Sequence, residues 1–165
     1  MKTANVANIT GTDVAVFLEP PGKTPDTERR LYVEHWGPAE WNTLFEYTVP
    51  VELDAGEVLI EQNASDRALF FVTSGKLEVA SIDAADSSVS RIATISPGFI
   101  VGEFSFFDGG PRSAKVWAVA RSRLLKLTLQ EYERYRSQHL AESSSLLFAL
   151  AHLLAVRVRN AIARR

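Results

Sequence analysis

The most informative part of the chain is residues 102–118, which read Gly-Glu-Phe-Ser-Phe-Phe-Asp-Gly-Gly-Pro-Arg-Ser-Ala-Lys-Val-Trp-Ala. It places a carboxylate, Glu103, ahead of several small and turn-forming residues, and then an arginine, Arg112, ahead of an apolar segment. A guanidinium presents a planar fork of donors that suits two phosphate oxygens. An ionised glutamate only accepts hydrogen bonds, so it repels phosphate and suits hydroxyl groups such as those of a ribose. Together these residues predict a pocket for a nucleotide.

Small residues between the two charges favour the same pocket. Ser105 would let a phosphate approach the backbone closely, for the reason that glycine is found at such positions. Short turns rich in glycine and small residues expose backbone N–H groups, and the first turn of a helix adds a partial positive charge.

This stretch resembles the phosphate-binding cassette of the cyclic nucleotide-binding domain family. The family pattern is Gly-Glu-x-(Ala/Gly/Ser)-Leu, followed after a few variable residues by Pro-Arg-(Ala/Ser/Thr)-Ala-x-Val-x-Ala. The residues that match it are Gly102, Glu103, Ser105, Pro111, Arg112, Ser113, Ala114, Val116 and Ala118. The resemblance covers about residues 44–159. It implies that Arg112 binds a cyclic phosphate and that Glu103 binds the ribose 2′-hydroxyl. It also implies that the N–H groups near Phe104 and Ser105 and the Ser113 hydroxyl complete the phosphate site, although Ser113 could equally be a strand residue that bonds a neighbouring carbonyl.

The resemblance also implies that a final helix covers the base and moves when the ligand binds. Arg157 is the best-placed candidate for the base contact, with Arg159 and Asn160 as alternatives, and all three could instead be solvated charges on a helix face. The predicted ligand-binding set is Gly102, Glu103, Phe104, Ser105, Arg112, Ser113, Ala114 and Arg157. The expected ligand is cAMP or cGMP, with cAMP favoured. For Arg112, the alternative is an internal ion pair with Glu103 or Asp108.

The hydrophobic pattern predicts a mainly β fold with flanking helices. Residues 1–36, rich in proline, are expected to form an arm or linker with at most a short strand at Val14–Leu18. Residues 37–165 are expected to form the cyclic nucleotide-binding domain. Its helix begins near Pro38, and short strands over about residues 51–128 favour an antiparallel β-roll of jelly-roll type. One predicted turn, Thr73–Gly75, reverses the chain between two of these strands.

Two C-terminal helices are expected within about residues 129–163. Thr128 and Glu131 match a capping box at the start of the first. Ser143–Ser145 are expected to interrupt the helix, and a second helix should begin near Leu146. Its apolar stripe runs through Leu147, Leu150, Leu154, Val158 and Ala161. The stripe fits either packing on the chain's own roll or a homodimer interface.

The composition excludes several classes of function. The chain of 165 residues contains no cysteine, and its three histidines lie far apart, so no thiolate or histidine metal site is expected. No nucleotide-hydrolysis or nucleophile motif is present, so the chain is not expected to be an enzyme. We expect a cytoplasmic protein because neither a leader nor a membrane-spanning run is found. We also expect no DNA-binding domain, because the residues after the last predicted helix are too few to form one.

The leading hypothesis is a sensor that binds a cyclic mononucleotide and relays occupancy through its C-terminal helices. One alternative is a structural or protein-interaction module that has the same roll but binds no ligand. Another is the sensor domain of a larger transporter, channel or regulator, with a fused effector or a separate protein partner. A cyclic dinucleotide ligand is a third, which the bulk of Phe104 and Phe106 disfavours.

Overall fold

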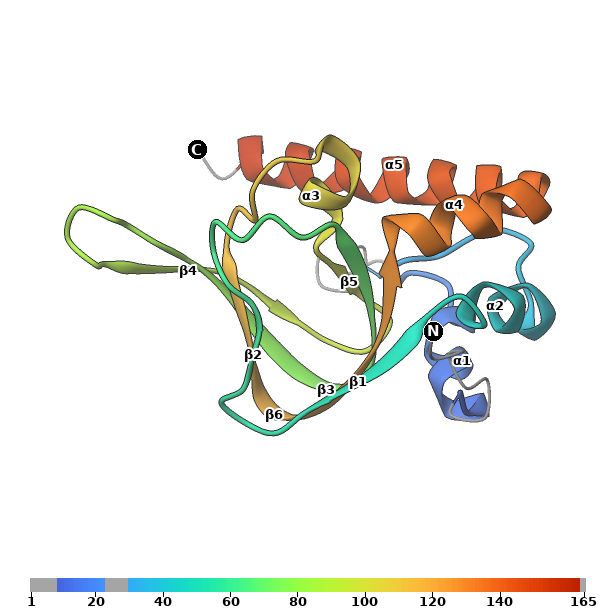
Figure 1. Cartoon of the computed structure of the whole chain (residues 1–165), viewed down its shortest axis with the longest axis horizontal. Helices are drawn as coiled ribbons and strands as arrows, with labels where there is room; N and C mark the ends of the chain where they lie inside the picture. Colours follow the sequence, from blue (N-terminus) through green and yellow to red (C-terminus); the bar gives the residue numbers. More distant parts are fainter. Residues whose placement is uncertain (1–8, 23–29, 164–165) are drawn as a thin grey trace.

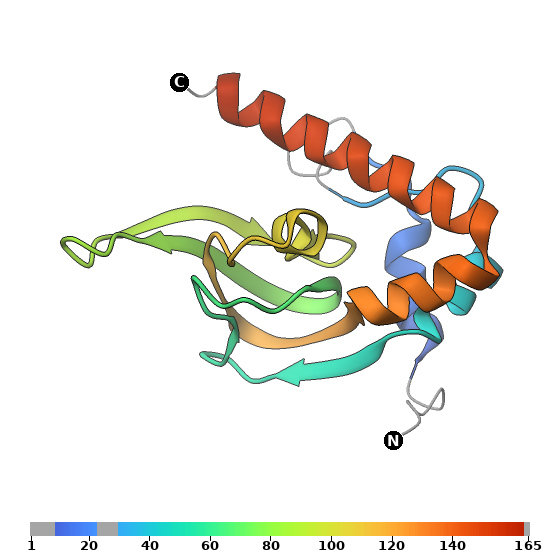
Figure 2. The ribbon, with the colours of Figure 1, turned by 45° about the horizontal axis from the view of Figure 1, so that its top comes forward.

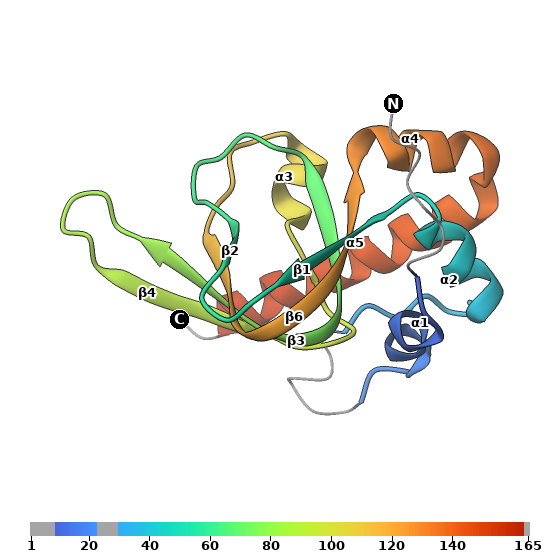
Figure 3. The ribbon, with the colours of Figure 1, turned by 60° about the horizontal axis from the view of Figure 1, so that its bottom comes forward.

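The computed structural model describes residues 9–22 and 30–163 (Figure 1). Its strands form an antiparallel sheet that curls into a roll, and the helices gather at one end and along one side of that roll (Figures 1 and 3). The strands are β1 (Val49–Leu53), β2 (Val58–Ile60), β3 (Ala68–Ile82), β4 (Val89–Ile95), β5 (Ile100–Val101) and β6 (Lys115–Thr128). The helices are α1 (Gly11–Leu18), α2 (Pro38–Phe45), α3 (Glu103–Asp108), α4 (Leu129–Gln138) and α5 (Leu140–Ala163). The predicted β-roll with flanking helices is confirmed.

Strands β3 and β6 form the centre of the sheet. The order is β1-β6-β3-β4, while β2 also pairs with β6 and β5 with β3. All of these pairings are antiparallel. Because β5 lies beside the start of β3, the chain that leaves β5 enters α3 at the open side of the roll.

Alternation along the central strands divides the core in two. In β3, Leu69 and Phe71 join the cluster under the helices, whereas Phe70 and Val72 join the cluster inside the roll. All four side chains are nearly inaccessible to solvent. Successive side chains of a strand point to opposite faces, so one strand supplies both clusters. The sheet therefore connects the helical layer to the interior of the roll.

The turn predicted at Thr73–Gly75 is wrong, because β3 continues through it as one strand of 15 residues. The register against β6 shifts around Ser74, and Gly75 has a φ of 88°. A Cβ on Gly75 would overlap the carbonyl oxygen of Arg121 on the neighbouring strand. The glycine thus marks an irregularity that bends a continuous strand, a conformation that side chains with a Cβ disfavour.

The strand suggested at Val14–Leu18 is also wrong, because these residues lie in helix α1. Thr10 caps this helix by accepting a hydrogen bond from the backbone N–H of Asp13, whose carboxylate accepts one in return from the Thr10 backbone. Val14 and Phe17 are buried with Trp41 of α2 in the helical core cluster. Apolar side chains on both sides of the expected boundary at residue 36 therefore share one core. The remainder of the expected arm, residues 1–8 and 23–29, lies outside the described residues.

Helix α5 begins at Leu140, earlier than expected, and the serine run does not interrupt it. The hydroxyls of Ser143 and Ser144 both donate to the carbonyl oxygen of Leu140, so the serines bond within the helix. Half of the capping box expected at α4 is present: the Thr128 hydroxyl accepts from the Glu131 N–H, whereas the Glu131 carboxylate pairs with Arg134. With a mean hydropathy of 1.6, α5 is apolar and long enough to cross a membrane. A single such helix is weak evidence, because helices of soluble cores pass the same test.

Candidate functional site

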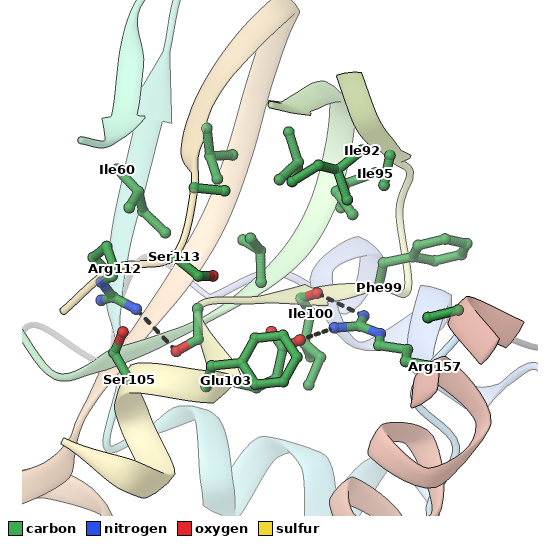
Figure 4. Close-up of a pocket in the computed structure, with 18 of the residues that line it drawn as sticks. Ile60, Ile92, Ile95, Phe99, Ile100, Glu103, Ser105, Arg112, Ser113 and Arg157 are labelled. Carbon is green, nitrogen blue, oxygen red and sulfur yellow. Dashed lines mark hydrogen bonds and ion pairs between the residues drawn. The ribbon is translucent and has the colours of Figure 1, made fainter. Parts of the chain in front are cut away.

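A cavity of about 320 Å³ opens between α3, the inside of the roll and the last turns of α5 (Figure 4). One end is polar and carries the side chains of Glu103, Ser105, Arg112 and Ser113. The other end is apolar, formed by side chains from the roll and α5. The main apolar residues that line the cavity are Ile60, Val79, Ile92, Ile95, Phe99, Val101, Val116 and Val158. In Figure 4, Ile92, Ile95 and Phe99 lie on the side away from Arg112, whereas Ile60 lies beside it. A cavity with one polar end and one apolar end suits a ligand that is anionic at one end and flat or apolar at the other.

Gly102 sets the geometry at the polar end. It is the N-cap of α3, with a φ of 90°, a left-handed conformation that glycine adopts without strain. A Cβ there would lie 2.7 Å from the carbonyl oxygen of Ala68 and 2.6 Å from Nη1 of Arg112. The missing side chain therefore lets the guanidinium of Arg112 lie directly against the backbone where β5 becomes α3.

Arg112 is buried and held on several sides, with 2% of its surface exposed. Its Nε and Nη2 donate to the two carboxylate oxygens of Asp66, at 3.1 and 2.5 Å. Nη2 also donates to the carbonyl oxygen of Ala68 and Nη1 to that of Gly102, each at 2.9 Å. A buried arginine requires a counter-charge, and here Asp66 supplies it. The internal ion pair considered above therefore exists, but its acid is neither Glu103 nor Asp108.

Asp66 reaches Arg112 because the loop between β2 and β3 pairs with the residues that precede β6. The Arg112 N–H donates to the carbonyl of Ala64, and the Asn63 N–H donates to the carbonyl of Arg112, each at 2.8 Å. Hydrogen bonding to the Arg112 guanidinium holds the pKa of the Asp66 carboxyl below its usual range. The Asp66 side chain is half-exposed, so the buried arginine is linked to solvent through this carboxylate.

The buried carboxylate of Glu103 is paired with an arginine from the far end of the chain. Nη1 of Arg157, on α5, donates to Oε1 of Glu103, and Nη2 of Arg157 donates to the carbonyl oxygen of Ile100 at 3.0 Å. The Glu103 side chain is 5% exposed and the Arg157 side chain is 19% exposed. Figure 4 shows Arg112 and Arg157 approaching the site from opposite sides, with Glu103 between them.

All eight residues of the predicted ligand-binding set line this one cavity. They are Gly102, Glu103, Phe104, Ser105, Arg112, Ser113, Ala114 and Arg157. Phe104 is half-exposed in the wall, whereas Phe106 is buried in the helical core and does not narrow the cavity. Asn160 also lines the cavity, while Arg159 lines a second groove with Pro21 and His152. The roles assigned to the eight residues remain predictions.

Sequence reasoning missed Asp66 and most of the apolar lining. Asp66 lies 46 positions before Arg112, within a polar loop whose pattern gives no sign of a buried partner. The lining residues Ile92 and Val158 are half-exposed at the mouth of the cavity, and they look like ordinary strand and helix residues. Only their position around the cavity connects them to the site.

The described part of the chain, residues 9–22 and 30–163, brings together no group of three or more acidic or histidine side chains that could hold a metal ion. The polar side chains that it does bring together at the cavity are two guanidiniums, two carboxylates, two hydroxyls and the amide of Asn160. This set can bind an anion and hydroxyl groups.

Residues 50–139 match the model of the cyclic nucleotide-binding domain. The chain belongs to this family. The match begins within β1 and ends just after α4, so it contains the whole cassette and leaves α1, α2 and α5 outside.

Solved structures of the family share the fold of this cyclic nucleotide-binding domain. The catabolite activator protein of Thermus thermophilus is 27% identical, with a TM-score of 0.71 over 79% of this chain and 59% of that one. A cyclic nucleotide-binding domain from Methylobacillus flagellatus is 20% identical, with a TM-score of 0.76 over 93% of this chain and 80% of that one. Glutaminase 1 of Bradyrhizobium diazoefficiens is 32% identical over 111 residues. That match covers 67% of this chain but 17% of the glutaminase.

Proposed function

We propose that the cavity binds a cyclic mononucleotide, with cAMP as the favoured ligand, and that the domain is a sensor of its concentration. The observation that carries this proposal is the buried guanidinium of Arg112 at the wall of a cavity that also contains Glu103 and Ser113. In this arrangement the phosphate would lie against Arg112, Ser113 and the first N–H groups of α3, and the ribose against Glu103. The first N–H groups of a helix have no partner within the helix, so they can donate to a ligand.

The contacts of Arg112 suggest how phosphate binding would proceed. A guanidinium has five N–H donors, and four of them are engaged by Asp66, Ala68 and Gly102. One donor on Nη1 is left for a phosphate oxygen. A second bond requires Asp66 to give up a contact, which its half-exposed position allows. Ligand binding would then shift the loop that carries Asp66.

The apolar end of the cavity favours adenine over guanine. Ile92, Phe99 and Val158 offer apolar surface, and Asn160 is the polar side chain from α5 that lines the cavity beside Arg157. Guanine carries more polar groups on its edge than adenine, and each polar group that is buried without a partner is costly. This argument supports cAMP as the preferred ligand.

The C-terminal helices are placed to relay occupancy. Arg157, Val158, Asn160 and Ala161 of α5 line the same cavity as the cassette. If α5 can lie in more than one place relative to the cassette, a bound ligand contacts it differently in each. A ligand with different contacts in two conformations shifts the equilibrium between them. The effector that reads the shift would be a fused domain of a larger transporter, channel or regulator, or a separate protein. We place the domain in the cytoplasm, where a nucleotide second messenger would reach it.

The direct test is isothermal titration calorimetry with cAMP, cGMP and 5′-AMP, supported by thermal denaturation. A ligand at 100 times its Kd adds about 2.7 kcal/mol to the free energy of unfolding, or roughly 5–10 °C for a domain of this size. We expect a clear shift with cAMP, a smaller one with cGMP and almost none with 5′-AMP.

Variants of Arg112 test the proposed anchor. Arg112→Ala should abolish cAMP binding, and Arg112→Lys, which retains the charge but loses the fork, should weaken it strongly. Arg121→Ala is the matched control, because Arg121 is an exposed arginine on β6 that pairs with Glu52 away from the cavity. Wild-type affinity in a folded Arg112→Lys variant would contradict the assignment. A wild-type protein that binds neither cyclic nucleotide would favour the protein-interaction alternative.

We further propose that the domain forms a homodimer through the outer face of α5. Seven small or apolar residues recur there in alternating steps of three and four, and one of them, the half-exposed Val158, also lines the edge of the cavity: Ala141, Ser144, Phe148, Ala151, Ala155, Val158 and Ile162. Phe148 is 79% and Ile162 67% exposed, and no residue of this stripe is charged. A strict alternation of three and four is the seam of a two-stranded coiled coil. Exposed apolar faces of this kind mark interaction sites.

The chain's lack of cysteine allows a clean test of the dimer. A single Ala155→Cys substitution in the seam should cross-link under mild oxidation, and His152→Cys, on the flank of the seam, should cross-link less. Phe148→Glu should convert the dimer to a monomer in light scattering. A wild-type protein that stays monomeric at high micromolar concentration would contradict this proposal without affecting the proposed ligand.

A further inference from the structure

The C-terminal end of α3 is held by an arginine that lies outside the cassette. The guanidinium of Arg67 donates to the carbonyl oxygen of Phe106 from Nε at 3.3 Å and from Nη2 at 2.8 Å, and Nη2 also donates to the carbonyl oxygen of Phe107 at 3.1 Å. Carbonyl groups in the last turn of a helix have no partner within the helix, and a cation there is favourable. Arg67 therefore caps the helix that follows Gly102.

Gly109 makes room for this cap. It ends α3 with a φ of 70°, and a Cβ at this position would lie 3.3 Å from Nη1 of Arg67. Glycine adopts this left-handed conformation without strain, and its missing side chain lets the guanidinium lie close to the end of the helix.

The backbone of Arg67 is fixed to the centre of the sheet. Its carbonyl oxygen accepts from the N–H of Leu129, the first residue of α4, at 3.2 Å. The next residue, Ala68, pairs with Thr128 where β3 lies beside β6. In contrast, α3 has only six residues, too few for a helix to be stable without contacts from outside. Figure 2 shows this short helix, in yellow, between the roll and α5, so the Arg67 side chain connects it to the central strands.

Two adjacent residues thus hold the two charged parts of the proposed ligand site. Asp66 bonds the guanidinium of Arg112, and Arg67 bonds the helix that carries Glu103 into the cavity. Oε1 of Glu103 accepts from Arg157, so we assign the ribose hydroxyl to Oε2. Where that oxygen lies relative to the Arg112 guanidinium depends on the position of α3.

We propose that Arg67 is a positioning residue for the ligand: it fixes α3 so that the Glu103 carboxylate meets the ribose while Arg112 meets the phosphate. Arg67 does not line the cavity, so it acts through α3 and does not touch the ligand. This inference rests on the proposed function and adds to the site a residue from the loop between β2 and β3.

The reasoning predicts which part of the ligand loses affinity when Arg67 is replaced. Without the cap, the end of α3 can move, and Glu103 is no longer aligned with the 2′-hydroxyl. Arg112 keeps its place, because Asp66 and the carbonyl oxygen of Ala68 still hold it. Loss of a hydrogen bond to a charged group changes affinity by roughly tenfold or more. The loss should therefore fall on the ribose contact and spare the phosphate contact.

Calorimetry with cAMP and 2′-deoxy-cAMP measures this change at a temperature where every variant is folded. In Arg67→Gln the Kd for cAMP should rise about tenfold, while the Kd for 2′-deoxy-cAMP should change little. The wild-type preference for cAMP should therefore almost disappear. Arg67→Lys keeps the charge but loses the fork that spans two carbonyls, so its preference should be intermediate. The control is Arg121→Gln, at an exposed arginine of β6 that pairs with Glu52, and it should keep the wild-type preference.

Hydrogen exchange without ligand tests the cap directly. The N–H groups of Phe106 and Gly109 donate to the carbonyl oxygens of Gly102 and Ser105, so their exchange reports the opening of α3. Both amides should exchange faster in Arg67→Gln than in wild type, and at the wild-type rate in Arg121→Gln.

An unchanged preference for cAMP in Arg67→Gln would overturn the inference, whether or not the variant is less stable, because Arg67 would then contribute to stability alone. A wild-type protein that binds both ligands equally would overturn it too, since Glu103 would then have no ribose bond to align. Unchanged exchange of the two amides would show that Arg67 does not hold α3. Failure of the proposed function looks different, because the wild type would then bind neither ligand.

Discussion

Replacing Asp66 by asparagine tests the electrostatic account of the site. The substitution keeps the size of the side chain but removes the charge that faces Arg112, which is 2% exposed. Breaking a fully buried ion pair costs about 3–5 kcal/mol. The Asp66 side chain is half-exposed, and Arg112 keeps its bonds to the Ala68 and Gly102 carbonyls. After this discount for solvent screening, we expect Asp66→Asn to lower the free energy of unfolding by about 1–2 kcal/mol at pH 7.

The pH dependence of this difference follows from the pKa of Asp66. Hydrogen bonding to Arg112 lowers the pKa of the carboxyl in the folded protein, whereas in the unfolded chain it returns to about 3.9. The stabilisation is therefore complete above the unfolded pKa and is lost as the pH falls through the folded one. The gap between wild type and Asp66→Asn should be constant from about pH 7 to pH 5 and should narrow towards about pH 3.

Urea denaturation followed by tryptophan fluorescence measures the gap, because Trp41 is fully buried in the helical core. Asp54→Asn, the same chemical change at an exposed turn residue, is the control and should have little effect at any pH. If wild type and Asp66→Asn have the same free energy of unfolding at pH 7, or if their difference is as large at pH 3 as at pH 7, Asp66 does not stabilise Arg112 in this way.

Two further substitutions test how the fold is held. Asp13→Asn should lower the free energy of unfolding by about 2–4 kcal/mol, because Asp13 is buried and accepts from Nε of Arg123 at 2.9 Å; urea denaturation measures this. Burial raises the pKa of Asp13, but its hydrogen bonds to Arg123 and Thr10 outweigh this effect, so the pKa in the folded protein lies below its usual value. The difference in stability between wild type and Asp13→Asn should therefore shrink as the pH falls, and a difference that grows in acid would contradict this account. Gly75→Ala should lower the free energy of unfolding by about 2–4 kcal/mol in thermal denaturation, since its φ of 88° and the nearby Arg121 carbonyl leave no room for a methyl group; a change under about 0.5 kcal/mol would show that β3 can rearrange there.

Much of the secondary structure could be predicted because its causes are local. The strand at Val89–Ile95 and the cap formed by Thr128 depend on residues that are close in the sequence, and both are present in the structure. The errors occur where distant contacts decide the outcome. The sequence around Gly75 predicts a turn, but pairing with β6 keeps this segment in one strand. The residues of α1 were predicted as a strand, but in the helix Phe17 packs against Trp41.

The polar residues of the cassette could be predicted as a candidate site from the sequence, because they form one continuous segment whose order of glutamate, small residues and arginine is visible in the chain. The partner of each charge, in contrast, depends on the three-dimensional packing. Arg112 meets Asp66, 46 positions away, and Glu103 meets Arg157, 54 positions away. The spacing of residues in the sequence indicates which side chains are neighbours along one strand or helix. The partner of a buried charge, in contrast, depends on how separate strands and helices pack together.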